Sequence, residues 1–118
     1  MSLSTNLLDA LSSENRIFVA FSGGLDSTAL LFLCNKALKQ KKIRNLKAIH
    51  INHNLSKNSD KWQQHCESFC RSNNIEFESF MVEVPKNRSS IESQARQARF
   101  KIFESLLDEN DQILLAHH

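Results

Sequence analysis

The sequence predicts an α/β fold in which a parallel, Rossmann-like sheet carries helices on both faces. Short apolar runs rich in β-branched and aromatic residues alternate with longer segments whose leucines recur at helical spacing. The only two glycines of the chain, Gly23 and Gly24, are adjacent and directly follow an apolar run and one serine. A strand, a glycine-containing turn and a helix, in this order, provide the backbone geometry that cradles phosphate groups.

Length and composition indicate a single globular domain. The 118 residues suffice for one domain and are too few for two, and 41% of them are apolar and 24% charged, as in ordinary globular proteins. The net charge of +2 permits a nucleotide or nucleic-acid partner without arguing for one. The sequence has no apolar run that would span a bilayer and no signal peptide, so we expect a cytoplasmic protein without a membrane partner.

Four elements are predicted in the first half of the chain. Leucines at positions 3, 7, 8 and 11 predict a short amphipathic helix over residues 3–13. The run RIFVAF predicts a buried strand over residues 16–21, and leucines at helical spacing predict a helix over residues 26–41. The run LKAIHIN predicts a second strand over residues 46–52.

The alternation continues with a helix and a third strand. Trp62, Cys66, Phe69 and Cys70 share one helical face, which predicts a helix over residues 60–72. Residues 75–84 alternate strongly enough for a strand, which is compatible with a place at the edge of the sheet. Pro85 ends that strand because it lacks an amide hydrogen.

The last helix and strand lead to the end of the chain. Ser89 and Glu92 have the spacing of a capping box, so we expect a helix from there to about residue 108. The run QILLA predicts a fourth strand over residues 112–116, and parallel sheets bind ligands at the carboxyl ends of their strands. Because the chain stops at His118, within such a strand end, we expect a fragment that is truncated after the fourth strand.

The three cysteines, Cys34, Cys66 and Cys70, form no Cys-x-x-Cys pair. We interpret them as small apolar packing residues in a reducing compartment. The alternative is a metal or iron–sulfur site, but Cys66 and Cys70 have helical spacing and no fourth ligand is evident.

The segment Ser22-Gly23-Gly24-Leu25-Asp26-Ser27 is the candidate phosphate-binding loop. Its glycines allow a sharp turn and a close approach of the backbone to an anion. We expect the amides of the following helix, together with nearby hydroxyl groups, to donate hydrogen bonds to phosphate oxygens. The hydroxyl donors are Ser22, Ser27 and Thr28. The loop fits neither the Walker A pattern nor the dinucleotide pattern, and the alternative is an ordinary turn capped by Ser or Asp.

Asp26 places a carboxylate where a polyphosphate is expected, and the two anions repel each other at close range. A Mg²⁺ ion that bridges the carboxylate and a phosphate removes this repulsion, and Mg²⁺ prefers hard oxygen ligands. Asp26 is therefore the candidate metal ligand and a candidate catalytic residue.

The loop resembles that of the PP-loop ATP pyrophosphatase superfamily, whose pattern is Ser-Gly-Gly-x-Asp-Ser. The resemblance implies an adenine nucleotide alpha-hydrolase-like fold, with residues 1–118 as the N-terminal part of a PP-loop ATP-binding domain. It also implies that residues 22–27, Leu25 included, hold ATP so that AMP is transferred and pyrophosphate is released.

Three further segments resemble the tRNA(Ile)-lysidine synthetases. Residues 50–56 are similar to that family's His-x-Asn-His-Gly-Leu stretch, with Asn54 in place of Gly. Residues 92–100 are similar to its Glu-x-x-Ala-Arg-x-x-Arg-Tyr helix, with Phe100 in place of Tyr. Residues 116–118 match the start of its Ala-His-His motif, so the resemblance covers nearly the whole chain.

This second resemblance implies an ATP-dependent ligation with tRNA(Ile) and free L-lysine as partners. The wobble cytidine is adenylated, and the ε-amine of lysine then displaces AMP to give lysidine. Arg96 suits a phosphate or a developing negative charge because of its guanidinium fork, the alternative being a solvated helix face. His117 is expected to touch nucleotide or substrate. For Arg99, His50 and His53, a role in the site and a structural role stay open.

Two other functions also stay open. One is another PP-loop enzyme, such as a tRNA thiolase, although those that thiolate cytidine typically carry Cys-x-x-Cys pairs. The other is an ATP-binding module without chemistry, and Asp26 argues against it because simple binding needs no carboxylate beside the phosphates.

Overall fold

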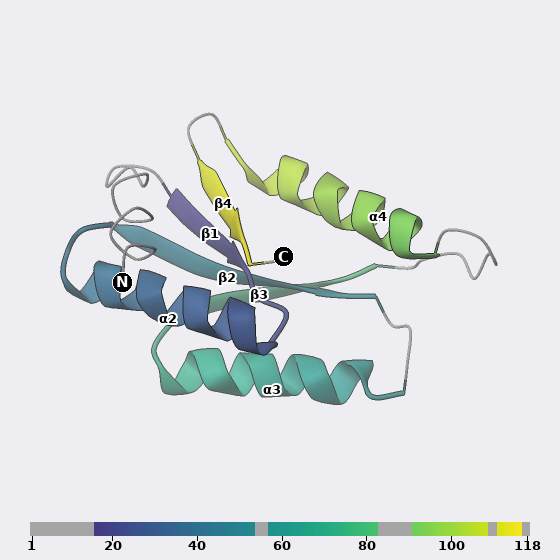
Figure 1. Cartoon of the computed structure of the whole chain (residues 1–118), viewed down its shortest axis with the longest axis horizontal. Coiled ribbons are helices and arrows are strands. Elements are labelled where there is room, and N and C mark those ends of the chain that lie inside the picture. Colours follow the sequence, from purple (N-terminus) through teal and green to yellow (C-terminus); the bar gives the residue numbers. More distant parts are fainter. Residues whose placement is uncertain (1–15, 54–56, 83–90, 109–110, 117–118) are drawn as a thin grey trace.

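The computed structural model describes residues 16–53, 57–82, 91–108 and 111–116, and the structural statements below concern these residues (Figure 1). Strands and helices alternate along them as the sequence predicts. In chain order they are β1 (Arg16–Ala20), α2 (Leu25–Lys39), β2 (Asn45–Asn52), α3 (Ser59–Ser72), β3 (Glu76–Met81), α4 (Ile91–Leu106) and β4 (Gln112–Leu115).

The four described strands form one parallel sheet in the order β3-β2-β1-β4. Val19 at the centre of β1 pairs with Ala48 of β2 on one side and with Leu114 of β4 on the other. The chain therefore moves outward from β1 to β3 and then crosses back to the opposite side of β1. The strand order reverses between β1 and β4, which is where open α/β sheets form their ligand crevice.

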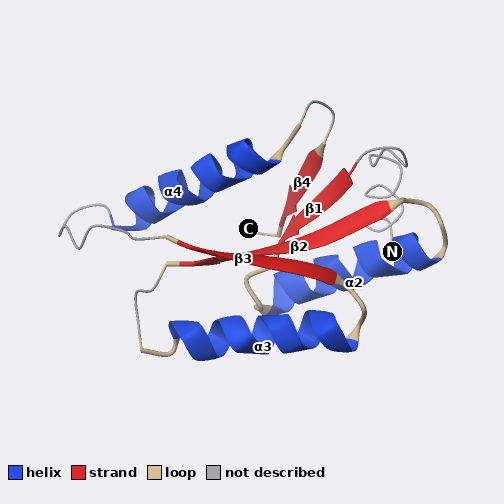
Figure 2. Cartoon of the chain, turned by 180° about the vertical axis from the view of Figure 1, so that it is seen from behind, coloured by secondary structure: helices blue, strands red, loops and turns tan. Residues whose placement is uncertain are grey.

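Helices cover both faces of the sheet, which confirms the predicted fold class. Figures 1 and 2 show α2 and α3 packed on one face and α4 on the other. Successive strand residues point to opposite faces, so Val19 packs with Leu31 and Cys34 while Phe18 packs with Ile49 and Phe103. The two faces thus carry two separate apolar cores, and both leave the carboxyl edge of the sheet open for a site.

Some boundaries differ from the predicted ones, for local reasons. α2 ends at Lys39 rather than at residue 41 because Lys41 has a left-handed backbone (φ 62°) that no helix continues. β3 ends at Met81 rather than at residue 84, because its neighbour β2 ends at Asn52, the residue that pairs with Met81. β3 lies at the edge of the sheet. The predicted helix 3–13 lies outside the described residues, as does the start of the predicted capping box.

The three cysteines lie in the core between the sheet and the helices α2 and α3. All three are free and fully buried, which supports their interpretation as packing residues. Burial raises the pKa of the Cys34 thiol and of the Cys66 thiol to about 11. The pKa of Cys70 rises to about 12 because of burial and, to a smaller extent, the neighbouring Cys66.

We expect these thiols to resist alkylation in the native protein. A thiol with a pKa of about 11 is ionised in roughly one molecule per thousand at pH 8, and only the thiolate attacks iodoacetamide. Mass spectrometry should therefore find the native chain unmodified at pH 8 and triply alkylated in denaturant. Because the thiols stay protonated longer in the folded state, the free energy of unfolding should fall as the pH rises from about 9 towards 11. Rapid labelling of the native chain at pH 8 would contradict the burial of these thiols.

Among the described residues, none of the helices combines the length and apolarity that crossing a lipid bilayer requires.

Candidate nucleotide-binding site

A cavity of about 440 Å³ lies at the carboxyl edge of the sheet. Residues from the ends of β1, β2 and β4 line it, together with residues of α3 and α4. The apolar part of its wall is formed by Ile49, Ile51, Phe103 and Leu115, and the polar part includes Ser22, His50, His53 and Arg99. Its size and mixed lining are those of a pocket for a small molecule.

The loop between β1 and α2 is held from inside by the side chain of Ser27, which is 3% exposed. The Oγ atom of Ser27 accepts hydrogen bonds from the backbone amides of Ser22 and Gly23, each at 3.2 Å. The hydroxyl of Thr28 donates to the Gly24 carbonyl at 2.7 Å. The Oγ atom of Ser22 accepts a hydrogen bond from the Gly24 amide at 3.2 Å. All three hydroxyls expected to face phosphate are therefore engaged with the loop's own backbone.

The start of α2 carries no side-chain cap. Gly24 is its N-cap residue, with an extended backbone (φ −73°, ψ 172°), and makes no side-chain cap hydrogen bond. A turn capped by Ser or Asp was the alternative interpretation of this loop, and at the N-cap position itself the residue is glycine. An uncapped helix start concentrates amide donors and the positive end of the helix dipole, which suits an anion.

The two glycines have different structural roles. Gly23 has a left-handed backbone (φ +88°), and a β-carbon there would lie 2.7 Å from the Sγ atom of Cys66 and 3.0 Å from the Trp62 ring. A β-carbon on Gly24 would meet only the Oγ atom of Ser22, at an ordinary 3.4 Å. The fold therefore requires glycine at position 23, whereas position 24 leaves space above the loop that a ligand can use.

Trp62 supports the loop from α3, a role that the sequence did not reveal. Its indole Nε1 donates a hydrogen bond to the Ser22 carbonyl at 2.5 Å, and its ring stacks on His65 with centroids 5.0 Å apart. Helical spacing correctly placed Trp62 on the same face as Cys66. The contact with a loop 40 residues earlier depends on how α3 docks, and no local pattern encodes that.

Two of the predicted catalytic residues, Asp26 and Arg96, do not line the cavity. Asp26 is exposed in the first turn of α2, and Leu25 is 87% exposed beside it. Arg96 is exposed on α4, with its guanidinium over the Phe100 ring at 5.6 Å. His117 lies outside the described residues. Of the six predicted loop residues, Ser22 lines the cavity itself, and Asp26 stands at the uncapped helix start.

Arg99, rather than Arg96, lines the cavity. Its Nε–H group is buried and donates a hydrogen bond to no described residue, and the buried Nδ1 atom of His53 also has no hydrogen-bond partner among them. Burial lowers the pKa of His53, and the neighbouring Arg99 and His50 lower it further. His53 is therefore neutral at pH 7, and the wall presents one permanent cation together with polar atoms that lack partners among the described residues.

His50 and Asn52 tie the end of β2 to its surroundings. The Nδ1 atom of His50 lies 2.9 Å from the Phe21 carbonyl, and since a carbonyl only accepts, Nδ1 carries the hydrogen. Asn52 donates to Asp60 at 3.1 Å and to Gln63 at 2.9 Å, both on α3. His50 is only 5% exposed, and it both forms a structural hydrogen bond and lines the cavity wall.

No three His, Cys, Asp or Glu side chains within the described ranges form a group that could hold a metal ion.

The loop, the uncapped helix and the cavity at the point where strand order reverses define a nucleotide-binding α/β domain. The family model of the PP-loop domain matches residues 2–118, and the chain belongs to this family. Its curated relatives include the tRNA(Ile)-lysidine synthase of Histophilus somni (strain 2336), which is 40% identical over 113 residues. The tRNA(Ile)-lysidine synthase of Legionella pneumophila (strain Lens) is 40% identical over 116 residues. These alignments cover 96% and 98% of the chain, which spans about a quarter (26%) of the length of either relative.

A solved structure shares the fold. The U34-tRNA thiolase NcsA from Methanococcus maripaludis, with its 4Fe-4S cluster, superposes with a TM-score of 0.70 over 99% of this chain and 45% of that one. The sequence identity is 21%, so this likeness concerns the fold alone.

Proposed function

We propose that the chain forms the ATP-binding part of a tRNA(Ile)-lysidine synthase. Such an enzyme is a carbon–nitrogen ligase that joins lysine to the wobble cytidine of tRNA(Ile) in the cytoplasm. The observation that carries the proposal is the loop 22–27, whose uncapped helix start lies beside a cavity at the reversal point of the sheet. The 40% identity to tRNA(Ile)-lysidine synthases, over nearly the whole chain, supports this choice of substrates.

The loop suits the phosphates of ATP, and the cavity suits its nucleoside part. The space above Gly24 admits a phosphate close to the backbone, and the first turn of α2 presents amides to it. The apolar wall formed by Ile49, Ile51 and Phe103 offers contact area for a base. Asp26, exposed at the helix start, would hold Mg²⁺ together with the phosphates, and the ion would offset their charge.

The chemistry requires two displacements. First, the carbonyl oxygen of the wobble cytidine forms a bond to the α-phosphorus of ATP, and the bond to pyrophosphate breaks. Second, the ε-amine of lysine forms a bond to the cytosine ring carbon that carries this oxygen, and the amine loses a proton. The bond from that carbon to the oxygen breaks, and AMP leaves with the former carbonyl oxygen. Negative charge grows on phosphate oxygens in the first step, so a fixed cation at the cavity lowers the barrier.

We assign that cation to Arg99, in preference to Arg96. Arg99 lines the cavity and its buried Nε has no hydrogen-bond partner among the described residues, whereas Arg96 is exposed. We expect Arg99→Gln to lower kcat/KM for pyrophosphate release by about 100-fold, because removing one preorganised charge donor costs this much. Arg96→Gln should stay within about threefold of the parent, as for an exposed side chain. The opposite ranking would restore the assignment of Arg96. For His117, which lies outside the described residues, a contact with nucleotide or substrate stays a prediction.

Pyrophosphate release by the protein that carries this chain tests the proposed reaction. The assay is run with tRNA(Ile) and lysine together, with each alone, and with neither. We expect tRNA-dependent release of pyrophosphate and formation of lysidine only when both are present. The proposal would be overturned if pyrophosphate release did not depend on tRNA(Ile), or if lysidine formed at the same rate without added lysine.

Within this chain, the three cysteines do not favour a thiolase. Thiolation needs reactive thiols or a cluster near the site, whereas Cys34, Cys66 and Cys70 lie in the core with raised pKa values.

A further inference from the structure

Positive charge is distributed very unevenly along this chain. Residues 27–59 contain seven lysines and arginines and no aspartate or glutamate. The whole chain has a net charge of +2, and because this segment alone carries +7, the remaining residues together carry −5. Such an asymmetry within one domain indicates a surface that attracts an anionic partner.

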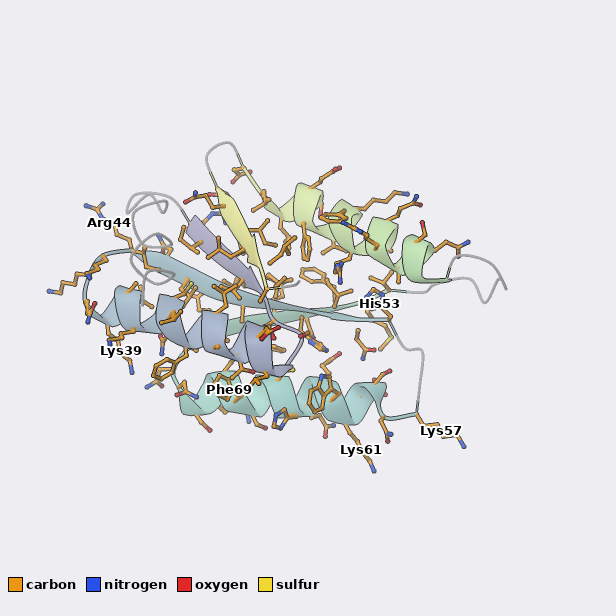
Figure 3. All side chains as sticks on the ribbon, viewed as in Figure 1. Lys39, Arg44, His53, Lys57, Lys61 and Phe69 are labelled. Atoms are coloured by element: carbon orange, nitrogen blue, oxygen red, sulfur yellow. The ribbon has the colours of Figure 1, made fainter. Side chains whose placement is uncertain are left out.

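Five of these cations meet at one corner of the molecule, which we call the α2–β2 corner. It consists of the last turn of α2 and the turn into β2, and its basic residues are Lys36, Lys39, Lys41, Lys42 and Arg44. All five side chains are exposed. Figure 3 shows Lys39 and Arg44 at the end of the molecule opposite His53 and Lys57. The corner thus lies at the amino edge of the sheet, away from the candidate nucleotide site.

Three cations elsewhere in the described chain, Arg16, Lys47 and Arg71, form salt bridges with carboxylates. Arg16 pairs with Asp108 and Asp111 at 2.9 and 2.6 Å, and Lys47 pairs with Glu78 at 2.6 Å. No described carboxylate forms a salt bridge with any cation of the α2–β2 corner. Glu76 is the acidic residue nearby, since it lines the same shallow groove as Arg44. The corner therefore presents unneutralised positive charge to solvent.

Helix stability explains only part of this charge. Lys36 and Lys39 lie in the last turn of α2, where cations interact favourably with the helix dipole. Lys42 and Arg44 lie beyond the helix and gain little from it. Lys41 has a left-handed backbone (φ 62°), a conformation that glycine or asparagine adopts at lower cost. A lysine there adds charge to the corner at the expense of local backbone energy.

We propose that the α2–β2 corner binds the phosphodiester backbone of RNA. This inference rests on the proposed function, in which tRNA is the substrate, and it names a contact remote from the reacting base. Exposed lysines on flexible stems act as point charges, which suits phosphate binding without base recognition. The long axis of the molecule is 45 Å, so one turn of a nucleic-acid duplex, about 34 Å, is of comparable length. A bound RNA can therefore reach both the corner and the opposite edge of the sheet.

Two charge-matched triple variants of the protein test the proposal. The first is Lys39→Gln, Lys42→Gln and Arg44→Gln in the corner, and it leaves the strained Lys41 untouched. The control is Lys57→Gln, Arg71→Gln and Lys101→Gln, three exposed residues spread over the other elements. Fluorescence anisotropy measures binding to labelled tRNA(Ile) between about 50 and 200 mM salt, where phosphate contacts change affinity strongly.

We expect the corner variant to bind tRNA(Ile) at least tenfold more weakly at about 100 mM salt. When the logarithm of the association constant is plotted against the logarithm of the salt concentration, the magnitude of the slope should decrease by roughly 2 to 3. Each lost phosphate contact removes about 0.9 from this magnitude. The control should lose less than threefold. Equal losses in the two variants would show that net charge alone matters, and an unchanged corner variant would show that RNA does not bind there. Either result overturns the proposal.

Two further measurements separate this proposal from others. Calorimetric titration with ATP and Mg²⁺ should give the same affinity for the corner variant and the parent, because the corner is remote from the loop. Binding of the parent to anionic lipid vesicles, lost in the corner variant while tRNA binding persists, would assign the surface to a membrane instead. If pyrophosphate release proves independent of tRNA(Ile), the proposed reaction fails, and the anisotropy data still decide whether RNA binds the corner.

Discussion

Replacing Gly23 by alanine should abolish ATP binding by this domain. The added methyl group would lie 2.7 Å from the Sγ atom of Cys66 and 3.0 Å from the Trp62 ring, and both are held by the packing of α3. The backbone at this position is left-handed (φ +88°), which costs an alanine about 1–2 kcal/mol in addition to the overlap. We expect the loop to move, the ATP affinity to fall more than 100-fold and the free energy of unfolding to drop by about 2–4 kcal/mol. Calorimetric titration and denaturant unfolding measure the two effects.

Gly24→Ala is the matched control for this experiment. Its methyl group meets only Ser22 Oγ at 3.4 Å, and its backbone conformation is open to any residue, so the free energy of unfolding should change by less than about 0.5 kcal/mol. The ATP affinity should nevertheless fall, because the methyl group fills the space that we assign to a phosphate. A Gly23→Ala variant that binds ATP like the parent would show that α3 does not constrain the loop.

Replacing Asp26 by asparagine should lower Mg²⁺-dependent pyrophosphate release by about 100- to 1,000-fold, the range typical of losing one electrostatic contact in a transition state. Asparagine keeps the shape of the side chain and removes the negative charge that we assign to the metal. Without Mg²⁺, ATP should bind the variant at least as well as the parent, because the repulsion between carboxylate and phosphates is gone. Initial rates over a Mg²⁺ titration, combined with ATP binding in the presence of a chelator, measure both effects.

Glu104→Gln serves as the control for Asp26→Asn, because Glu104 is an exposed carboxylate on α4 outside the cavity wall. It should leave the Mg²⁺ dependence unchanged. If Asp26→Asn shows the same Mg²⁺ response as this control, Asp26 does not hold the metal.

The sequence predicted the layers of this fold because its patterns are local. Each strand is a short apolar run and each helix repeats its apolar residues every three or four positions, so alternation alone indicated a parallel sheet with two covered faces. Strand ends were less predictable. The end of β3 depends on where its neighbour β2 stops, and no residue of β3 itself encodes that.

The candidate site was predictable at the loop and ambiguous elsewhere. Residues 22–27 are contiguous, so the sequence displays their spacing directly. Arg96 and Arg99 are three positions apart on one helix, and both have their guanidinium groups near the Phe100 ring. Helical periodicity therefore places both on nearly the same face, and only the docking of α4 on the sheet decides that Arg99 lines the cavity.

From the contact between Trp62 and Ser22, we also expect the site to form late in folding. Its two partners are 40 residues apart, and Gly23 packs against residues of the same helix. Contacts between distant segments form late, because the intervening chain must first lose its freedom. During synthesis, the loop residues therefore emerge well before the helix that shapes them. We expect a nascent chain to become competent for nucleotide only after α3 has docked on the sheet.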